Sequence, residues 1–272
     1  MPHIIDMAIE ITSKDNAAVK NAAKLMNSAK ERREQQCFIA EGVRLCTEAL
    51  ENGCELTEVF YTEEANNKYT ETVAKLEAKA EKAYLITEEI ANKIADTVTP
   101  QGIFVVGKMI QNHIDLDNIK TDGMYVLLEN LQEPSNIGAI FRTAEALWLN
   151  GALLTSDCCD PYNPKTMRAS MGAVFRLPYA VINDVVATMN ACKAKNMRPI
   201  ATVPGGDASK ITSIRFFKGV IMCVGNEGNG LTEQLKGVCG ERVTIPMNGR
   251  AESLNAATAA AILMWEMVRN YL

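Results

Sequence analysis

Metal ligands are few in this sequence and are not clustered. It has only two histidines, His3 and His113, and its eight cysteines never form a Cys-x-x-Cys pair. Zinc sites usually contain closely spaced pairs of such ligands. The scattered thiols are therefore interpreted as reduced, mostly buried small side chains, and no metal is predicted. No Gly-x-Gly-x-x-Gly motif follows an apolar run, so the usual dinucleotide fingerprint is missing too.

Targeting and membrane signals are also missing. No apolar run approaches the roughly 20 residues that span a bilayer, and the first residues lack the basic flank and apolar core of a signal peptide. The chain has 272 residues, of which 47% are hydrophobic and 22% charged. These values are typical of a soluble protein with two domains of ordinary size. We expect a cytoplasmic protein with no membrane partner.

Three polar segments follow strand-like apolar runs. A Gly-Asn-Glu-Gly-Asn-Gly-Leu segment at 225–231 follows the run 220–224, and Ile-Pro-Met at 245–247 with Ser-Leu-Asn at 253–255 follows a second run. An Asn-Ile-Gly-Ala-Ile-Phe-Arg-Thr-Ala segment at 136–144 follows the run 125–128. Parallel sheets build ligand crevices at the carboxyl ends of their strands, where glycine lets the backbone approach a ligand. These segments together predict a binding site.

In this order, the three segments resemble the motifs of the SpoU (TrmH-like) branch of the SPOUT methyltransferases. The segment 165–173 also looks like the intermediate loop of that family. The resemblance implies an α/β protein whose C-terminal parallel-sheet domain contains a deep trefoil knot. It implies S-adenosylmethionine-dependent methylation of a ribose 2′-hydroxyl in RNA by a homodimer. Ribosomal RNA is the first expectation and transfer RNA the second; a catalytically silent RNA-binding protein and a nucleotide-binding oxidoreductase are the alternatives.

The resemblance also implies roles for individual residues. The implied catalytic residues are Arg142, Asn136, Glu227, Ser253 and Asn255. The implied cofactor-binding residues are Gly225, Asn226, Gly228, Ile245, Met247 and Leu254. Arginine is protonated at nearly every accessible pH, so Arg142 either positions the acceptor hydroxyl or its phosphate, or relays a proton. No histidine lies near the motifs to serve as the usual base.

Domain organisation is predicted as a substrate-binding domain at 1–107, a linker at 108–122 and a catalytic domain at 123–272. The first segment resembles the small ribosomal-protein-like α/β domain that precedes many SpoU catalytic domains. It is acidic, with 12 basic and 18 acidic residues, but residues 14–33 carry a local charge of +4. That basic run is either a solvated helix face or an RNA-contacting edge. The candidate RNA-binding residues are Lys20, Lys24, Arg32, Arg33, Arg168 and Ser170.

Alternating apolar and helical patterns predict the elements of both domains. In the first domain we expect a helix at 17–33, a second ending at 50, and strands at 38–40, 59–61, 83–86 and 102–106. In the second we expect strands at 124–128, 152–155, 199–203, 220–224 and 243–245. Its helices are expected at about 137–149, 184–195, 231–237 and 254–271. The last helix is apolar nearly all round, which indicates a core helix or a dimer interface.

Overall fold

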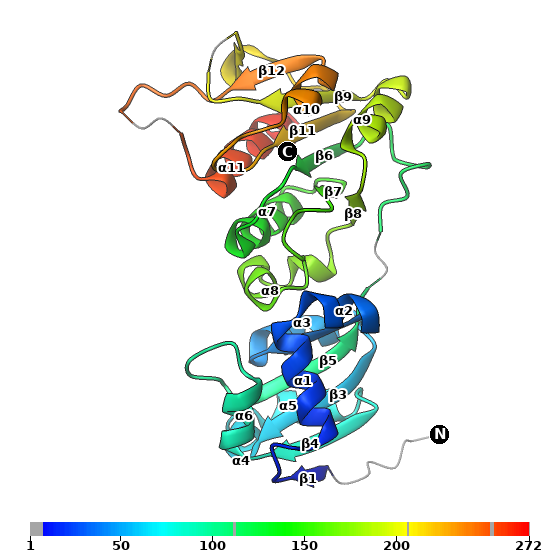
Figure 1. The fold of residues 1–272 in the computed structure, drawn as a ribbon, viewed down its shortest axis with the longest axis vertical. Coiled ribbons are helices and arrows are strands. Elements are labelled where there is room, and N and C mark those ends of the chain that lie inside the picture. Colours follow the sequence, from blue (N-terminus) through cyan, green and yellow to red (C-terminus); the bar gives the residue numbers. More distant parts are fainter. Residues whose placement is uncertain (1–7, 111–112, 206, 251–252, 272) are drawn as a thin grey trace. The chain divides into compact units, whose positions relative to one another are not determined.

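The structure is a computed structural model, and it describes residues 8–110, 113–205, 207–250 and 253–271. The chain forms two compact units. The first comprises residues 1–111 and 162–175, and the second residues 112–161 and 176–272. Figure 1 shows that each unit has its own sheet flanked by helices. None of the helices in the described ranges is long and apolar enough to cross a bilayer.

The first unit is built on a five-stranded sheet in the order β1-β4-β3-β5-β2. Its strands are β1 Ile9–Ile11, β2 Cys37–Glu41, β3 Leu56–Thr62, β4 Lys82–Ile86 and β5 Ile103–Lys108. Its helices are α1 Ala17–Asn27, α2 Ala29–Gln35, α3 Val43–Glu51, α4 Glu63–Lys68, α5 Thr70–Glu77, α6 Glu88–Ile94 and α8 Pro164–Ser170, with a 3-10 turn at Ala173–Phe175. Strands β1, β4 and β3 are parallel, whereas β5 is antiparallel to β3 and β2. The predicted α/β domain is therefore present.

The helix predicted at 17–33 is wrong in one respect, because it is two helices that meet at Ser28. The backbone of Ser28 is extended, and its hydroxyl accepts a hydrogen bond from the Glu31 N–H at 3.3 Å. A serine in this position satisfies a free N–H at the start of a helix, so it favours a new start over continuation. The result is a sharp break between α1 and α2.

The second unit is built on a seven-stranded, wholly parallel sheet in the order β10-β12-β9-β11-β6-β7-β8. Its strands are β6 Met124–Leu128, β7 Gly151–Thr155, β8 Tyr179–Ile182, β9 Arg198–Thr202, β10 Ser209–Lys210, β11 Val220–Val224 and β12 Glu241–Thr244. Strands β6 and β11 are adjacent, and all their residues are buried. Continuous apolar strands of this kind require helices on both faces of the sheet.

Four helices supply that cover: α7 Pro134–Ala146, α9 Val185–Ala194, α10 Glu233–Val238 and α11 Ala256–Val268. Residues of α9 and α10 share one buried cluster with Tyr125 and Leu127 of β6. On the opposite face of the sheet, α11 contacts β11 and α7 contacts β7, and these two helices pack against each other. Because all strands of this sheet are parallel, the carboxyl ends of β6, β11 and β12 lie at the same edge of the sheet.

The segment predicted as a linker contributes to the second unit. Ile119 is buried in its core, and Ile114 and Leu116 pack against the same cluster. Three strands lack a clear sequence signal, namely β1, β8 and the two-residue β10. Each is short and lies at or beside an edge of its sheet, where little apolar periodicity is needed.

Candidate functional site

The loop that follows β11 is closed on itself by its own backbone. Asn226 and Gly230 exchange two hydrogen bonds, with N···O distances of 3.2 and 2.8 Å. The Asn226 side-chain oxygen accepts from the N–H groups of Gly228 at 2.8 Å and Asn229 at 3.2 Å. A Cβ at Gly225 would lie only 2.2 Å from the carbonyl carbon of Gly230. Only glycine fits at this position without opening the loop.

The same loop is fastened to the end of β6. The Asn226 side-chain amide donates to the Asn130 carbonyl at 2.8 Å. Glu129 is buried, and its carboxylate accepts from both the N–H and the hydroxyl of Thr232, each at 2.7 Å. These three partners could not be predicted from the sequence, because a polar residue just after a strand usually indicates an exposed loop.

Three predicted catalytic side chains form one hydrogen-bonded chain. Asn255 caps α11 by accepting from the N–H groups of Ala257 and Thr258. Its amide nitrogen therefore faces Asn136 and donates to that side-chain oxygen at 3.0 Å. Asn136 is buried and in turn donates its own amide to the Glu227 carboxylate at 2.6 Å. The cap thus fixes the orientation of both amides.

A cavity of about 410 Å³ lies beside this chain of side chains. All six predicted cofactor residues line it, together with Glu227 and Ser253. Apolar side chains of Leu231, Val243 and Leu263 line it as well. Its volume is in the range of small-molecule sites, which are about 300–1,000 Å³, and such sites also combine apolar walls with a few fixed polar groups.

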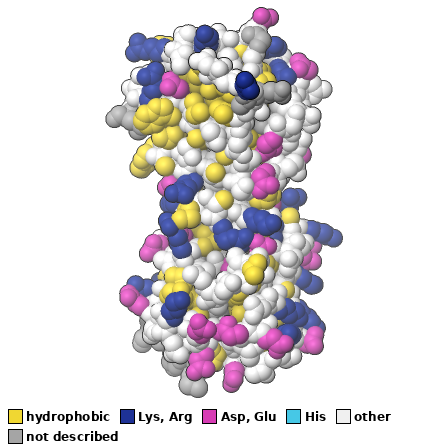
Figure 2. All heavy atoms as spheres, turned by 90° about the vertical axis from the view of Figure 1, so that its left-hand side faces the viewer, with side chains coloured by type: hydrophobic (Ala, Val, Ile, Leu, Met, Phe, Trp, Pro, Cys, Tyr) yellow, Lys and Arg dark blue, Asp and Glu magenta, His cyan; other side chains and the backbone are white. Residues whose placement is uncertain are grey.

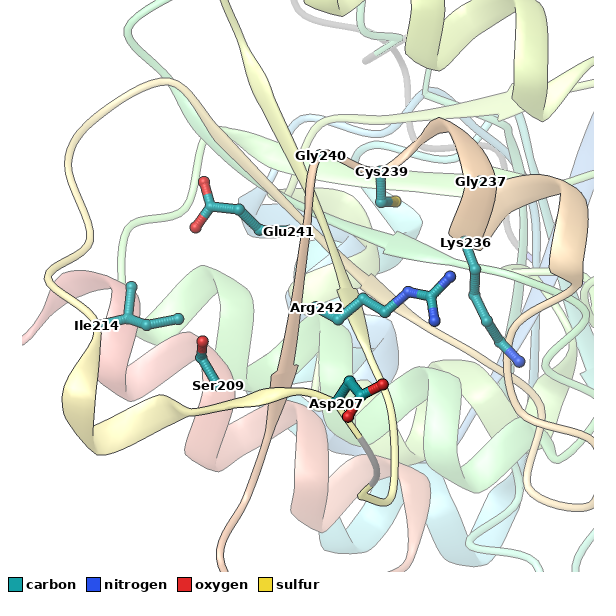
Figure 3. A pocket seen from close by; sticks show the side chains of 9 residues that line it. All are labelled: Asp207, Ser209, Ile214, Lys236, Gly237, Cys239, Gly240, Glu241 and Arg242. Atoms are coloured by element: carbon teal, nitrogen blue, oxygen red, sulfur yellow. The ribbon is translucent and has the colours of Figure 1, made fainter.

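A second cavity, of about 460 Å³, lies beside β10, β12 and α10 (Figure 3). Charged side chains from Asp207, Lys236, Glu241 and Arg242 line it, and Figure 3 shows the Arg242 side chain extending toward that of Lys236. Lys236 also lines the first cavity, but none of the predicted site residues lines the second. The first cavity is therefore the candidate functional site, because all the predicted cofactor residues line it and none of them lines the second cavity.

Arg142 is not brought to the lining of the first cavity. It lies on α7, six residues after Asn136, which corresponds to about 9 Å along a helix axis. Its side chain is exposed, and within the described residues it has no ion pair or hydrogen bond. The guanidinium is therefore open to a ligand on the surface of α7.

The structure assigns two predicted RNA-binding residues to other roles. Arg32 is only 2% exposed, and its guanidinium donates to the carbonyls of Leu25 at 2.6 Å and Met26 at 3.2 Å. Ser170 is buried, and its hydroxyl donates to the Met167 carbonyl at 2.8 Å. Both predictions of an RNA contact are wrong because these polar groups are sequestered by the protein's own backbone.

The other predicted RNA-binding residues differ in their surroundings. Lys24 and Arg33 are exposed on α1 and α2. Lys20 is exposed as well and pairs with Asp15 at 2.9 Å. Arg168 is partly buried and pairs with Asp96 at 2.5 Å. Among these residues, Lys24 on α1 and Arg33 on α2 are therefore the exposed cations that have no ion pair within the described part of the chain.

The eight cysteines are all free thiols, and seven of them are buried. Burial raises the pKa of Cys54 to about 12 and raises that of Cys46 still further. Among the described residues, no group of three or more His, Cys, Asp or Glu side chains could hold a metal ion. The thiols of Cys46 and Cys54 therefore stay protonated at neutral pH.

Comparison with known proteins matches residues 123–265 to the SpoU rRNA Methylase family and residues 16–105 to the MRM3-like substrate binding domain. A 23S rRNA (guanosine(2553)-2′-O)-methyltransferase of Bacillus subtilis is 30% identical over 260 residues, covering 95% of this chain and 98% of that protein.

Two solved structures are similar over nearly the whole chain. An AdoMet-bound rRNA methyltransferase from Sinorhizobium meliloti has a TM-score of 0.85 and 30% identity, covering 98% of this chain and 100% of that one. The SpoU methyltransferase AviRb from Streptomyces viridochromogenes, in complex with AdoMet, has a TM-score of 0.83 and 25% identity, covering 94% and 98%. On these grounds the chain belongs to the SpoU rRNA methylase family.

Proposed function

We propose that this protein transfers the methyl group of S-adenosylmethionine to a ribose 2′-hydroxyl of RNA, with ribosomal RNA favoured over transfer RNA. The observation that carries the proposal is the cavity lined by Glu227, whose carboxylate is hydrogen-bonded to Asn136 and, through it, to Asn255. The names of the relatives support the reaction, since the Bacillus subtilis protein is a 23S rRNA 2′-O-methyltransferase.

The lining of the cavity fits the cofactor. S-adenosylmethionine combines an adenine ring, a ribose and a charged amino acid tail. The backbone around Gly225 approaches the Gly230 carbonyl too closely for any side chain, so peptide groups border the cavity there. Leu231 and Leu263 offer apolar contact for a ring, while backbone groups of the 225–230 loop offer polar contact. We assign the loops 225–230 and 245–254 to the cofactor.

The bound cofactor supplies a methyl group that its sulfonium has already activated. A ribose hydroxyl is a weak nucleophile, so the protein must hold its oxygen in line with that methyl group, which can lower the barrier by several kcal/mol. Asn136 holds the Glu227 carboxylate through one oxygen, and a carboxylate has acceptor capacity left for a hydroxyl hydrogen. Glu227 therefore orients the acceptor hydroxyl and takes its proton as the new O–CH3 bond forms.

Arg142 acts on the same nucleotide through its charge. Its guanidinium cannot be deprotonated at physiological pH, so it binds the acceptor oxygen or the adjacent phosphate. It has no partner within the described residues that would compete for it. Ser253 lines the cavity and Asn255 caps α11, so both shape the site at the start of that helix.

We further propose a homodimer that uses the outer face of α11. Trp265, 49% exposed, and Ile262 project from this helix, and Leu254 is exposed just before it. Figure 2 shows hydrophobic side chains gathered on the side of the second unit that carries α7 and α11. Light scattering after gel filtration should give twice the monomer mass of 29.8 kDa. Trp265→Arg should give a monomer, whereas Val181→Ser, at an exposed residue of the edge strand β8, should stay dimeric.

We place this protein in the cytoplasm. Its RNA substrate is identified by mapping 2′-O-methyl groups in cells with and without the protein. The proposal predicts that one position, in ribosomal RNA, loses its methyl group when the protein is absent. A lost position in transfer RNA would identify the alternative substrate. If no position changes, the protein is a silent RNA-binding member of the family.

A further inference from the structure

Residues 162–175 belong to the methylase region by sequence but to the first unit by structure. The family match runs from 123 to 265, whereas these residues are part of the compact unit formed with residues 1–111. The chain therefore passes between the two units three times, near residues 111, 161 and 175. Two domains joined by a single linker move relative to each other by default, whereas these two units have three chain connections.

Aromatic packing holds both ends of the segment. Phe38 of β2 is buried, and its ring stacks on Tyr162 with the centroids 5.5 Å apart. The same ring contacts Phe175, with a centroid distance of 5.1 Å. The Tyr162 hydroxyl accepts a hydrogen bond from the Ile110 N–H at 3.0 Å. One side chain of the substrate-binding sheet thus contacts the first and last residues of the segment.

An ionic cluster holds its middle. Arg168 of α8 pairs with Asp96 at 2.5 Å and faces the Glu41 carboxylate at 3.8 Å. Glu41 is only 3% exposed, and it also accepts from the Asp96 N–H at 2.9 Å and from the Thr97 hydroxyl. A buried carboxylate is costly unless cations and donors surround it. Arg168 therefore neutralises charge inside the unit, and its guanidinium is engaged there.

We propose that Arg168 is a positioning residue for methyl transfer. Through Asp96 and Glu41 it fastens 162–175 to the unit that we propose holds RNA, and the chain on either side of this segment continues into the unit that carries the cofactor cavity. This inference rests on the proposed function. Arg168 acts without contacting RNA, because Asp96 and Glu41 already occupy its charge. It replaces the sequence-based prediction of an RNA contact.

The test compares Arg168→Gln, Asp96→Asn and the double variant in the full-length protein. Asp96 is the milder site, because its side chain is partly exposed. Lys165→Gln is the matched control, since Lys165 is an exposed cation on the same helix. We expect kcat at saturating RNA to fall about tenfold or more in each single variant, because small misplacements are costly in methyl transfer. RNA and cofactor affinity should stay unchanged, and the double variant should be no worse than the singles.

Three results would overturn the inference. Weaker RNA binding with a reduced salt slope would make Arg168 a phosphate contact. Wild-type kcat in every variant would remove any role in positioning. A lower melting temperature with normal kcat would make the cluster merely structural.

Amide hydrogen exchange measures how firmly residues 162–175 are held in the first unit, and the measurement does not require methyl transfer. Amides of 162–175 should exchange faster in Arg168→Gln and Asp96→Asn than in the wild type or Lys165→Gln. Wild-type exchange rates in the variants would contradict the inference even if no RNA were methylated. An inactive wild type would instead contradict the proposed function, so the two failures are distinguishable.

Discussion

Replacing Gly225 by alanine should disable the cofactor loop while leaving the rest of the fold in place. The added Cβ would lie 2.2 Å from the Gly230 carbonyl carbon, 2.3 Å from the Leu231 nitrogen and 2.5 Å from the Gly230 oxygen. All three are backbone atoms, so the clash cannot be relieved by a change of rotamer. The strands of the loop must separate, and the two hydrogen bonds between Asn226 and Gly230 are then lost.

The magnitude follows from those two hydrogen bonds. Each contributes about 1 kcal/mol net, so the closed loop becomes about 2 kcal/mol less favourable. If only the closed loop binds, cofactor affinity falls roughly 30-fold. Titration calorimetry with S-adenosylmethionine measures this change in affinity. The titration is carried out well below the melting temperature of the variant.

Gly237→Ala, on α10 and outside this cavity, is the control. Its Cβ would meet nothing within 4 Å. We expect its affinity to stay within about threefold of wild type, because no backbone has to move. If Gly225→Ala also binds within threefold, the closed loop is not the binding form and the assignment of this cavity is refuted.

Four other sets of substitutions test separate parts of the account. Arg142→Lys and Arg142→Ala should lower single-turnover methylation roughly a hundred- to thousand-fold, about 3–4 kcal/mol, with cofactor affinity unchanged; near wild-type rates would make this arginine structural. Neutralising Lys24 and Arg33 should flatten the salt dependence of RNA binding, and an unchanged salt slope would contradict their assignment as phosphate contacts. Arg32→Ala should lower the unfolding free energy by about 2 kcal/mol, because it leaves buried carbonyls unpaired. An unchanged unfolding free energy would contradict the buried role of Arg32. Trp148→Gly should raise stability by about 0.5–1 kcal/mol in thermal melts, because Trp148 is 87% exposed and has a φ of 57°; a loss of stability would show that its indole is packed in solution.

The strands at the centre of the second sheet could be predicted to the residue. The runs at 124–128 and 220–224 are wholly apolar, because parallel strands are covered on both faces, and the structure has β6 and β11 at these bounds. The edge strand β1 has only one buried residue, and β10 has none, so neither leaves a hydrophobic pattern. The knot implied by the resemblance stays a prediction.

The part of the site that depends on the positions of glycines could be predicted from the sequence. Glycines after parallel strands indicate a ligand loop, and the six predicted cofactor residues all line one cavity. Burial of polar side chains was not predictable. Arg32 lies in the charged run Lys-Glu-Arg-Arg-Glu and was expected to be exposed, yet it turns inward to two carbonyls. Glu129 and Thr232 are 103 residues apart, and no local pattern pairs them.

The central claim is that the cavity at 225–254 delivers a methyl group to a ribose oxygen of RNA. The most direct measurement incubates the purified protein with ribosomal RNA and S-adenosylmethionine carrying a labelled methyl group, followed by complete alkaline hydrolysis and mass spectrometry. A 2′-O-methyl group blocks cleavage of the adjacent phosphodiester, so the account predicts that the label appears in an alkali-resistant dinucleotide. It also predicts that Gly225→Ala reduces this product and Gly237→Ala does not. Label on a base, or no transfer with either ribosomal or transfer RNA, would contradict it.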